Sequence, residues 1–117
     1  MADMTAWYTI PLSSALPSQT LSVMLNGVQT RLWLRQLGVG LFVDIWAGGV
    51  PLAMGVLAQD RVALVNSSAS PLGGELYFID TSGTADPDYA GLGVRHLLYY
   101  RQDGTGVGTV AGAGEVG

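Results

Sequence analysis

The 117-residue sequence has no cysteine, no lysine and a single histidine. Without cysteine, the chain forms no disulfide and offers no thiolate to a metal ion. One histidine cannot supply the three or four ligands of a zinc site, so we expect no metal and no cofactor. Five arginines against nine acidic residues give a formal net charge of −4. This acidic balance argues against a nucleic-acid-binding surface, which needs clustered cationic side chains.

Long apolar runs are also missing. No stretch approaches 18 residues without a glycine, a proline or a charged residue, so we expect no membrane span and no membrane partner. The first ten residues lack both the basic and the apolar region of a signal peptide.

Apolar residues, in contrast, make up 49% of the chain, while only 12% of residues are charged. This composition provides ample material for one core, and we expect a single β domain over residues 1–102. Residues 103–117 are rich in glycine and have little to bury, so we expect them to form a flexible tail. A surface so poor in charge suits a protein packed against neighbours. The alternative is a monomer covered by Ser, Thr, Gly and Gln.

The dipeptide Asn26-Gly27 predicts the first of two β-hairpins. Both residues readily adopt the positive φ that a two-residue hairpin turn requires. The flanking residues alternate between apolar and polar, as they do when one face of a sheet is buried. Counting outward from the turn predicts these pairs: Leu25–Val28, Met24–Gln29, Val23–Thr30, Ser22–Arg31, Leu21–Leu32, Thr20–Trp33 and Gln19–Leu34.

A second hairpin is predicted around Gly48-Gly49. Because Pro51 cannot donate a ladder hydrogen bond, we expect its strand at the edge of a sheet. The predicted pairs on the apolar face are Ala47–Val50, Ile45–Leu52, Val43–Met54 and Leu41–Val56. Those on the opposite face are Trp46–Pro51, Asp44–Ala53 and Phe42–Gly55.

Further strands are predicted at Glu75–Asp80 and Val94–Arg101, separated by a polar loop at Thr81–Gly91. The segment Leu57–Arg61 is compatible with a helical turn, and Val62–Val65 with a short strand. The expected fold is therefore all-β: a small antiparallel β-sandwich or barrel built from hairpins, with at most one short helical turn.

No catalytic constellation is apparent. The histidine, His96, lies in a strand pattern on the apolar side, where a structural role is far more common than catalysis. Asp80 and Asp88 could contribute to a calcium site, but Asp86-Pro87-Asp88 is also an ordinary turn sequence. We therefore expect no catalytic residue.

The aromatic residues are the remaining candidates. Trp33 and Trp46 are predicted on faces opposite the apolar ones, with Arg31 and Arg35 nearby. Exposed Trp with Arg is typical of protein interfaces, so we predict these four as interface residues. The alternatives are stacking of a carbohydrate on the indoles and burial of both tryptophans in a closed sandwich.

The order of several motifs between Trp7 and Arg101 resembles the baseplate plug family of contractile-tailed phages, best known from a cyanophage tail. The resemblance lies in the succession of motifs and not in any one of them. The motifs are Tyr8-Thr9-Ile10-Pro11-Leu12, Gln19-Thr20-Leu21, Leu25-Asn26-Gly27-Val28, Arg31-Leu32-Trp33-Leu34-Arg35, Phe42-Val43-Asp44-Ile45, Gly73-Gly74-Glu75-Leu76-Tyr77 and Leu92-Gly93-Val94-Arg95-His96-Leu97-Leu98-Tyr99-Tyr100.

This resemblance implies a non-enzymatic virion component near the central hub of the tail baseplate, made in the host cytoplasm. Its implied partners are other baseplate proteins, among them hub, tail-tube, spike or wedge subunits. Baseplate symmetry implies a ring of copies with threefold or sixfold symmetry. The resemblance carries over no catalytic or ligand residues. Two other functions remain open: a carbohydrate-binding β-module of a tail or cell-surface protein, and a small hydrolase.

Overall fold

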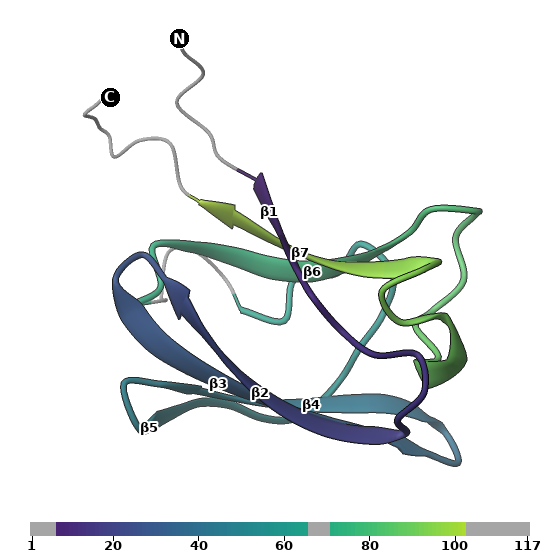
Figure 1. Cartoon of the computed structure of the whole chain (residues 1–117), viewed down its shortest axis with the longest axis horizontal. Helices are drawn as coiled ribbons and strands as arrows, with labels where there is room; N and C mark the ends of the chain where they lie inside the picture. Colours follow the sequence, from purple (N-terminus) through teal and green to yellow (C-terminus); the bar gives the residue numbers. More distant parts are fainter. Residues whose placement is uncertain (1–6, 66–70, 103–117) are drawn as a thin grey trace, which may run out of the picture.

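The computed structural model describes residues 7–65 and 71–102, which form seven β-strands in two antiparallel sheets. One sheet has four strands in the order β2-β3-β4-β5, and the other has three in the order β1-β7-β6. The sheets face one another as two layers, which confirms the predicted all-β class in the form of a sandwich (Figure 1). The strands are β1 (Trp7–Ile10), β2 (Ser18–Leu25), β3 (Val28–Leu37), β4 (Gly40–Ala47), β5 (Val50–Leu57), β6 (Gly74–Asp80) and β7 (His96–Gln102). The predicted tail at 103–117 lies outside the described residues.

The core fills the space between the sheets. Because side chains of a strand alternate between its two faces, every second residue of β3, β4, β6 and β7 points inward. Both sheets contribute side chains with no more than 1% exposure, among them Leu32, Leu34, Val43, Ile45, Leu76, Phe78, Leu98 and Tyr100.

The hairpin β2–β3 has the predicted register throughout, from Leu25 opposite Val28 to Gln19 opposite Leu34. Asn26 and Gly27 both have positive φ, at 52° and 74°, as the two-residue turn requires. Turn chemistry and period-two alternation therefore specify this hairpin locally.

The hairpin β4–β5 has the predicted turn, but its predicted register is wrong beyond Trp46–Pro51. An irregularity in β5 shifts the pairing, and Gly55 there has a φ of +62°. Its N–H donates to the side chain of Asp44 at 2.6 Å. The five predicted pairs that the structure does not contain are Ile45–Leu52, Val43–Met54, Leu41–Val56, Asp44–Ala53 and Phe42–Gly55. The observed pairs are Ile45–Ala53, Val43–Val56 and Phe42–Leu57. The C=O of Leu41 accepts the N–H of Ala58.

As predicted, the Pro51 strand lies at an edge of its sheet. The helical turn predicted at Leu57–Arg61 is absent, because β5 continues to Leu57 and Ala58 still donates to β4. Nor is there a regular strand at Val62–Val65. Instead, this segment follows β6 irregularly, with the Leu64 N–H donating to Leu76 C=O at 2.7 Å.

The second sheet contains both later predicted strands. β6 matches the prediction closely, whereas β7 begins at His96 and not at Val94. The N–H groups of Val94 and Arg95 both donate to Gly91 C=O in a turn before the strand. The only helical element among residues 7–65 and 71–102 is the 3-10 turn η2 (Tyr89–Gly91), and no described helix has the length and apolarity to cross a membrane.

Candidate functional site

The four predicted interface residues lie together on the outer face of the four-stranded sheet. Arg31, Trp33 and Arg35 alternate along β3, with their side chains directed away from the core. The β3–β4 register places Trp46 opposite Arg31 and Asp44 opposite Trp33. We call the surface made by Arg31, Trp33, Arg35 and Trp46 the arginine–tryptophan face.

Each arginine of this face stacks on an indole. The guanidinium carbon of Arg31 lies 4.2 Å from the ring centroid of Trp46, and that of Arg35 lies 4.2 Å from the ring centroid of Trp33. These distances lie well within the range of cation–π attraction. Trp33 is also held through its indole N–H, which donates to the Ser18 hydroxyl at 3.1 Å. The face is therefore built of large side chains that contact one another.

Asp44 supports this face from within the sheet. It is 8% exposed, and its Oδ1 lies 3.2 Å from Nη1 of Arg35. The same oxygen accepts the Gly55 N–H, so the shifted register of β5 also holds this carboxylate in place. Sequence reasoning missed this role of Asp44, because the register that brings Gly55 beside it was predicted incorrectly.

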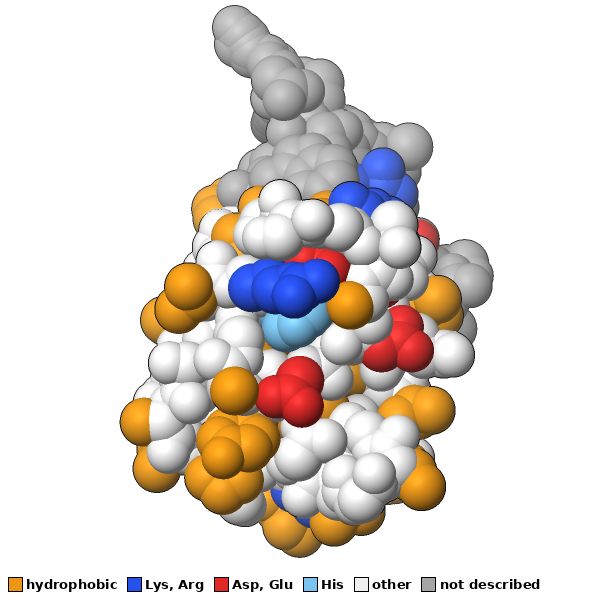
Figure 2. All heavy atoms as spheres, turned by 90° about the vertical axis from the view of Figure 1, so that its right-hand side faces the viewer, with side chains coloured by type: hydrophobic (Ala, Val, Ile, Leu, Met, Phe, Trp, Pro, Cys, Tyr) orange, Lys and Arg blue, Asp and Glu red, His pale blue; other side chains and the backbone are white. Residues whose placement is uncertain are grey.

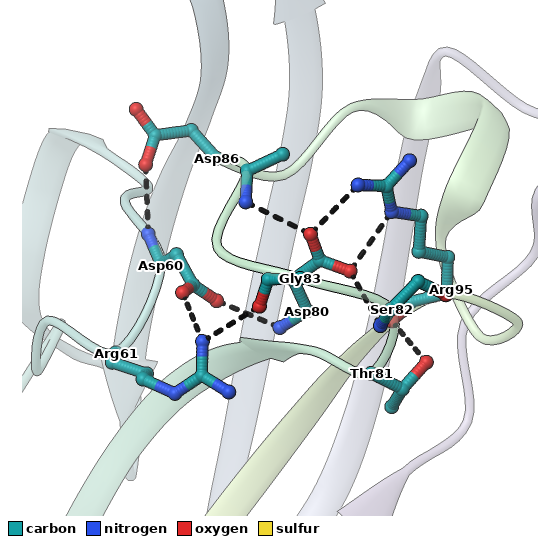
Figure 3. A network of polar contacts seen from close by, with 9 residues as sticks. Asp60, Arg61, Asp80, Thr81, Ser82, Gly83, Asp86 and Arg95 are labelled. Atoms are coloured by element: carbon teal, nitrogen blue, oxygen red, sulfur yellow. Dashed lines mark hydrogen bonds and ion pairs between the residues drawn. The ribbon is translucent and has the colours of Figure 1, made fainter.

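A second group of polar side chains lies where β6 ends and β7 begins, and we call Asp60, Arg61, Asp80 and Arg95 the polar cluster (Figure 3). Arg95 donates from Nε and Nη2 to the two carboxylate oxygens of Asp80, both at 2.8 Å. The Asp80 N–H donates to Asp60 at 2.7 Å, and Arg61 pairs with Asp60. Three segments far apart in sequence are thus tied together.

The carboxylate of Asp80 has a structural role, because both of its oxygens accept hydrogen bonds within the protein. It is 1% exposed and also accepts the N–H groups of Ser82 and Ala85 at 2.9 and 2.8 Å. The hydrogen-bonded Arg95 guanidinium, helped by these two N–H groups, holds the pKa of Asp80 well below its ordinary value. Arg95 in turn has a raised pKa because Asp80 stabilises its charged form.

The calcium alternative finds no support in this geometry. Asp88 caps η2 by accepting the Ala90 N–H at 2.9 Å, and Asp86 accepts the Asp60 N–H at 3.0 Å. Across residues 7–65 and 71–102, no three His, Asp or Glu side chains converge as metal ligands would.

His96 lies on the inner face of β7, as predicted, and is 4% exposed. Its Nδ1 has no hydrogen-bond partner among the described residues. Figure 2 looks onto this end of the molecule, where the histidine is seen among arginine and acidic side chains on a surface that is otherwise largely uncharged. A histidine this deeply buried is poorly placed to transfer protons to a substrate.

Among the other aromatic residues, Phe42 lies opposite Arg35 on the outer face of β4, beside the arginine–tryptophan face, whereas Tyr8, Tyr77, Tyr99 and Tyr100 belong to the second sheet. Tyr100 is buried, and Tyr8, which is 52% exposed, stacks on it with ring centroids 5.9 Å apart. Tyr77 and Tyr99 are paired across β6 and β7 and are half-buried. These four tyrosines thus lie away from the arginine–tryptophan face.

Comparison with known proteins gives one result. A search of curated proteins returned no match. The family model described as "Cyanophage baseplate Pam3 plug gp18" matches residues 7–103, which include every described strand. The role that this family indicates is structural, in the baseplate of a phage tail. This match, together with the all-β fold, shows that the chain belongs to the cyanophage baseplate plug family.

Proposed function

We propose that this protein is a non-enzymatic plug subunit near the hub of the baseplate, and that the arginine–tryptophan face binds neighbouring baseplate proteins. The observation that carries the proposal is the pair of Arg–Trp stacks on one sheet face, each with a centroid distance of 4.2 Å. The family assignment supports the structural role, and the face supplies a surface through which it could act.

The chemistry of the face suits adhesion. Tryptophan and arginine dominate the binding energy of protein interfaces because they bury large areas and can still form polar contacts. Trp33 is 36% exposed although it lies in the middle of a strand. Since the stacks and the Asp44 contact already restrict these side chains, little rotamer entropy remains to be lost on binding.

The rest of the surface agrees with a packed position in an assembly. Large apolar side chains are exposed elsewhere in the described part of the chain, including Val39 at 81%, Val94 at 73% and Val50 at 64%. Four of the five arginines form ion pairs within the protein, which leaves little free positive charge for solvent. We propose that several copies assemble as a ring of threefold or sixfold symmetry, with hub, tube, spike or wedge subunits covering these surfaces.

Carbohydrate binding is a weaker reading of the same face. A sugar-binding indole needs a free ring face for the pyranose, whereas an arginine already covers one face of Trp33 and one of Trp46. Hydrolysis is disfavoured by the burial of His96.

The proposal can be tested in purified phage tails. Tails assembled with the Trp33→Ser/Trp46→Ser chain should contain about tenfold less of this protein than tails assembled with the wild-type chain, because two anchors are removed. Quantitative mass spectrometry of the tails measures this occupancy.

Tyr77→Ser provides the matched control, because it removes an aromatic side chain from the other sheet. Circular dichroism of each isolated variant establishes that it folds. Unchanged occupancy of the folded double tryptophan variant would refute binding through this face, and absence of the wild-type chain from the tails would refute the baseplate role itself.

A further inference from the structure

Of the described sheet edges, that of β2 is both long and open. The segment after β5 follows the outer edge of β6, where the Leu64 N–H donates to Leu76 C=O at 2.7 Å. The edge strand β5 contains Pro51 and the irregularity at Gly55, both of which interrupt pairing, and β1 has only four residues. β2, in contrast, has eight residues without proline, glycine or charge, and among the described strands it pairs with β3 alone.

Half of the backbone groups of β2 point away from β3. In a two-residue hairpin the residues that flank the turn bond to each other, and bonded pairs recur at every second position. Leu25 is therefore bonded to Val28, and the odd-numbered residues of β2 bond to β3. The outward N–H and C=O groups belong to the even-numbered residues Ser18, Thr20, Ser22 and Met24. Such an edge is a template for an added strand.

The chain leaves the described fold beside this edge. β7 ends at Gln102, whose side-chain amide donates to Asn26 Oδ1 at 3.4 Å. Asn26 directly follows β2, and Figure 1 shows the end of β7 and the β2–β3 turn at the same end of the sandwich. The two sheets of a sandwich lie about 10 Å apart, a gap that three or four extended residues span. The chain after Gln102 can therefore reach the end of the β2 edge directly.

The remaining sequence is long enough to follow the whole edge. Residues 103–117 come after β7, and we call them the tail. Residues 103–106 can cross between the sheets, and residues 107–114 then equal β2 in number. Because the tail would start at the end of β2, it would run antiparallel to this strand.

The tail also alternates with a period of two, as a strand does. The odd positions from 105 to 113 carry Thr, Val or Ala, whereas the even positions from 104 to 114 carry glycine except at Val110. If Val107 lies opposite Leu25, then Thr109 and Ala111 face the core side of the edge. They would lie opposite Val23 and Leu21, which point toward the core but are only partly buried. The alternation thus matches what the edge leaves uncovered.

We propose that residues 107–114 add to β2 of the same molecule as a fifth, antiparallel strand, with Val107 opposite Leu25 and Ala113 opposite Gln19. The covalent connection at Gln102 favours the molecule's own tail, because tethering raises its local concentration at the edge and offsets the low strand propensity of glycine. The added strand covers backbone groups that could otherwise pair with another chain. This gives the tail a place in the fold that its composition did not predict, and it does not depend on the baseplate role.

Engineered disulfides test the pairing in the full chain, which has no cysteine of its own. Opposite residues on antiparallel strands have Cα atoms about 4.5–5.5 Å apart, a separation that a disulfide can bridge. Ser22→Cys/Val110→Cys should form an intramolecular disulfide about tenfold faster than Ser22→Cys/Ala111→Cys, because residue 111 directs its side chain to the opposite face. Non-reducing electrophoresis of dilute protein measures both rates.

Equal rates for the two cysteine pairs would overturn the proposal. Disulfides that link two chains would also overturn it, because they would assign the edge to the tail of a second copy.

Proline substitutions in the tail test the backbone hydrogen bonds without altering the described strands. In the proposed register the Val110 N–H donates to Ser22 C=O, whereas the Ala111 N–H points to solvent. Val110→Pro should speed hydrogen exchange of the Ser22 N–H by about tenfold, since it breaks the pairing. Ala111→Pro is the matched control and should leave this exchange as in the wild type. NMR measures the exchange, and equal rates in the wild type and Val110→Pro would refute the added strand.

Discussion

The stacking of Arg31 on Trp46 should contribute measurably to the free energy of unfolding. The guanidinium lies 4.2 Å from the ring centroid, Arg31 is exposed and Trp46 is half-buried. Cation–π pairs at exposed sites contribute about 0.5–1 kcal/mol, and desolvation increases this figure. We therefore expect a coupling free energy of about 1 kcal/mol between the two side chains.

A double-mutant cycle isolates this coupling. Urea unfolding of the wild type, Arg31→Gln, Trp46→Leu and the double variant gives four free energies of unfolding. Subtracting the effects of the two single substitutions from the effect of the double substitution gives the coupling free energy. The separate effect of each substitution on burial cancels in this difference. A coupling below about 0.3 kcal/mol would show that the stack does not order this face.

Arg35 provides an internal comparison. It stacks on Trp33 at the same distance and in addition pairs with Asp44, which is 8% exposed. Arg35→Gln should therefore lower the free energy of unfolding by about 0.5–1 kcal/mol more than Arg31→Gln does, because it also removes the ion pair with Asp44. Equal losses for the two variants would refute the supporting role of Asp44.

Three further outcomes follow from the described contacts. Gly27→Ala should cost about 1 kcal/mol for its positive φ alone, whereas Gly93→Ala should cost several times more because its Cβ would also meet a backbone carbonyl, and urea unfolding compares the two. Because the pKa of Asp80 is lowered in the folded state, the stability that depends on Asp80 should be complete above about pH 4 and be lost as the pH falls toward that lowered pKa. Asp80→Asn, which leaves Arg95 in place, should remove this part of the pH dependence of stability. Acid titrations followed by circular dichroism measure it. Tyr100→Phe should cost about 1–2 kcal/mol in thermal or urea unfolding, since it removes a buried 2.5 Å hydrogen bond to a loop carbonyl; a loss near zero would contradict that assignment.

Local chemistry determined much of the fold. The Asn26-Gly27 turn and the alternation beside it specified a complete register, because a two-residue turn fixes which residues face each other and period two fixes which face is buried. The same alternation placed Trp33 and His96 on the correct faces of their strands.

Contacts between distant segments determined the rest. Asp44 and Gly55 shifted the register of β5, and β6 drew the segment after β5 along its edge where a helical turn had been predicted. Turn chemistry and alternation do not predict either contact, since the first depends on an irregularity inside β5 and the second joins segments that no tight turn connects. Likewise, the sequence alone placed Arg31 and Trp46 on the outside of two hairpins, but only the β3–β4 pairing put one over the other, because strand order is set by how the whole apolar surface is buried.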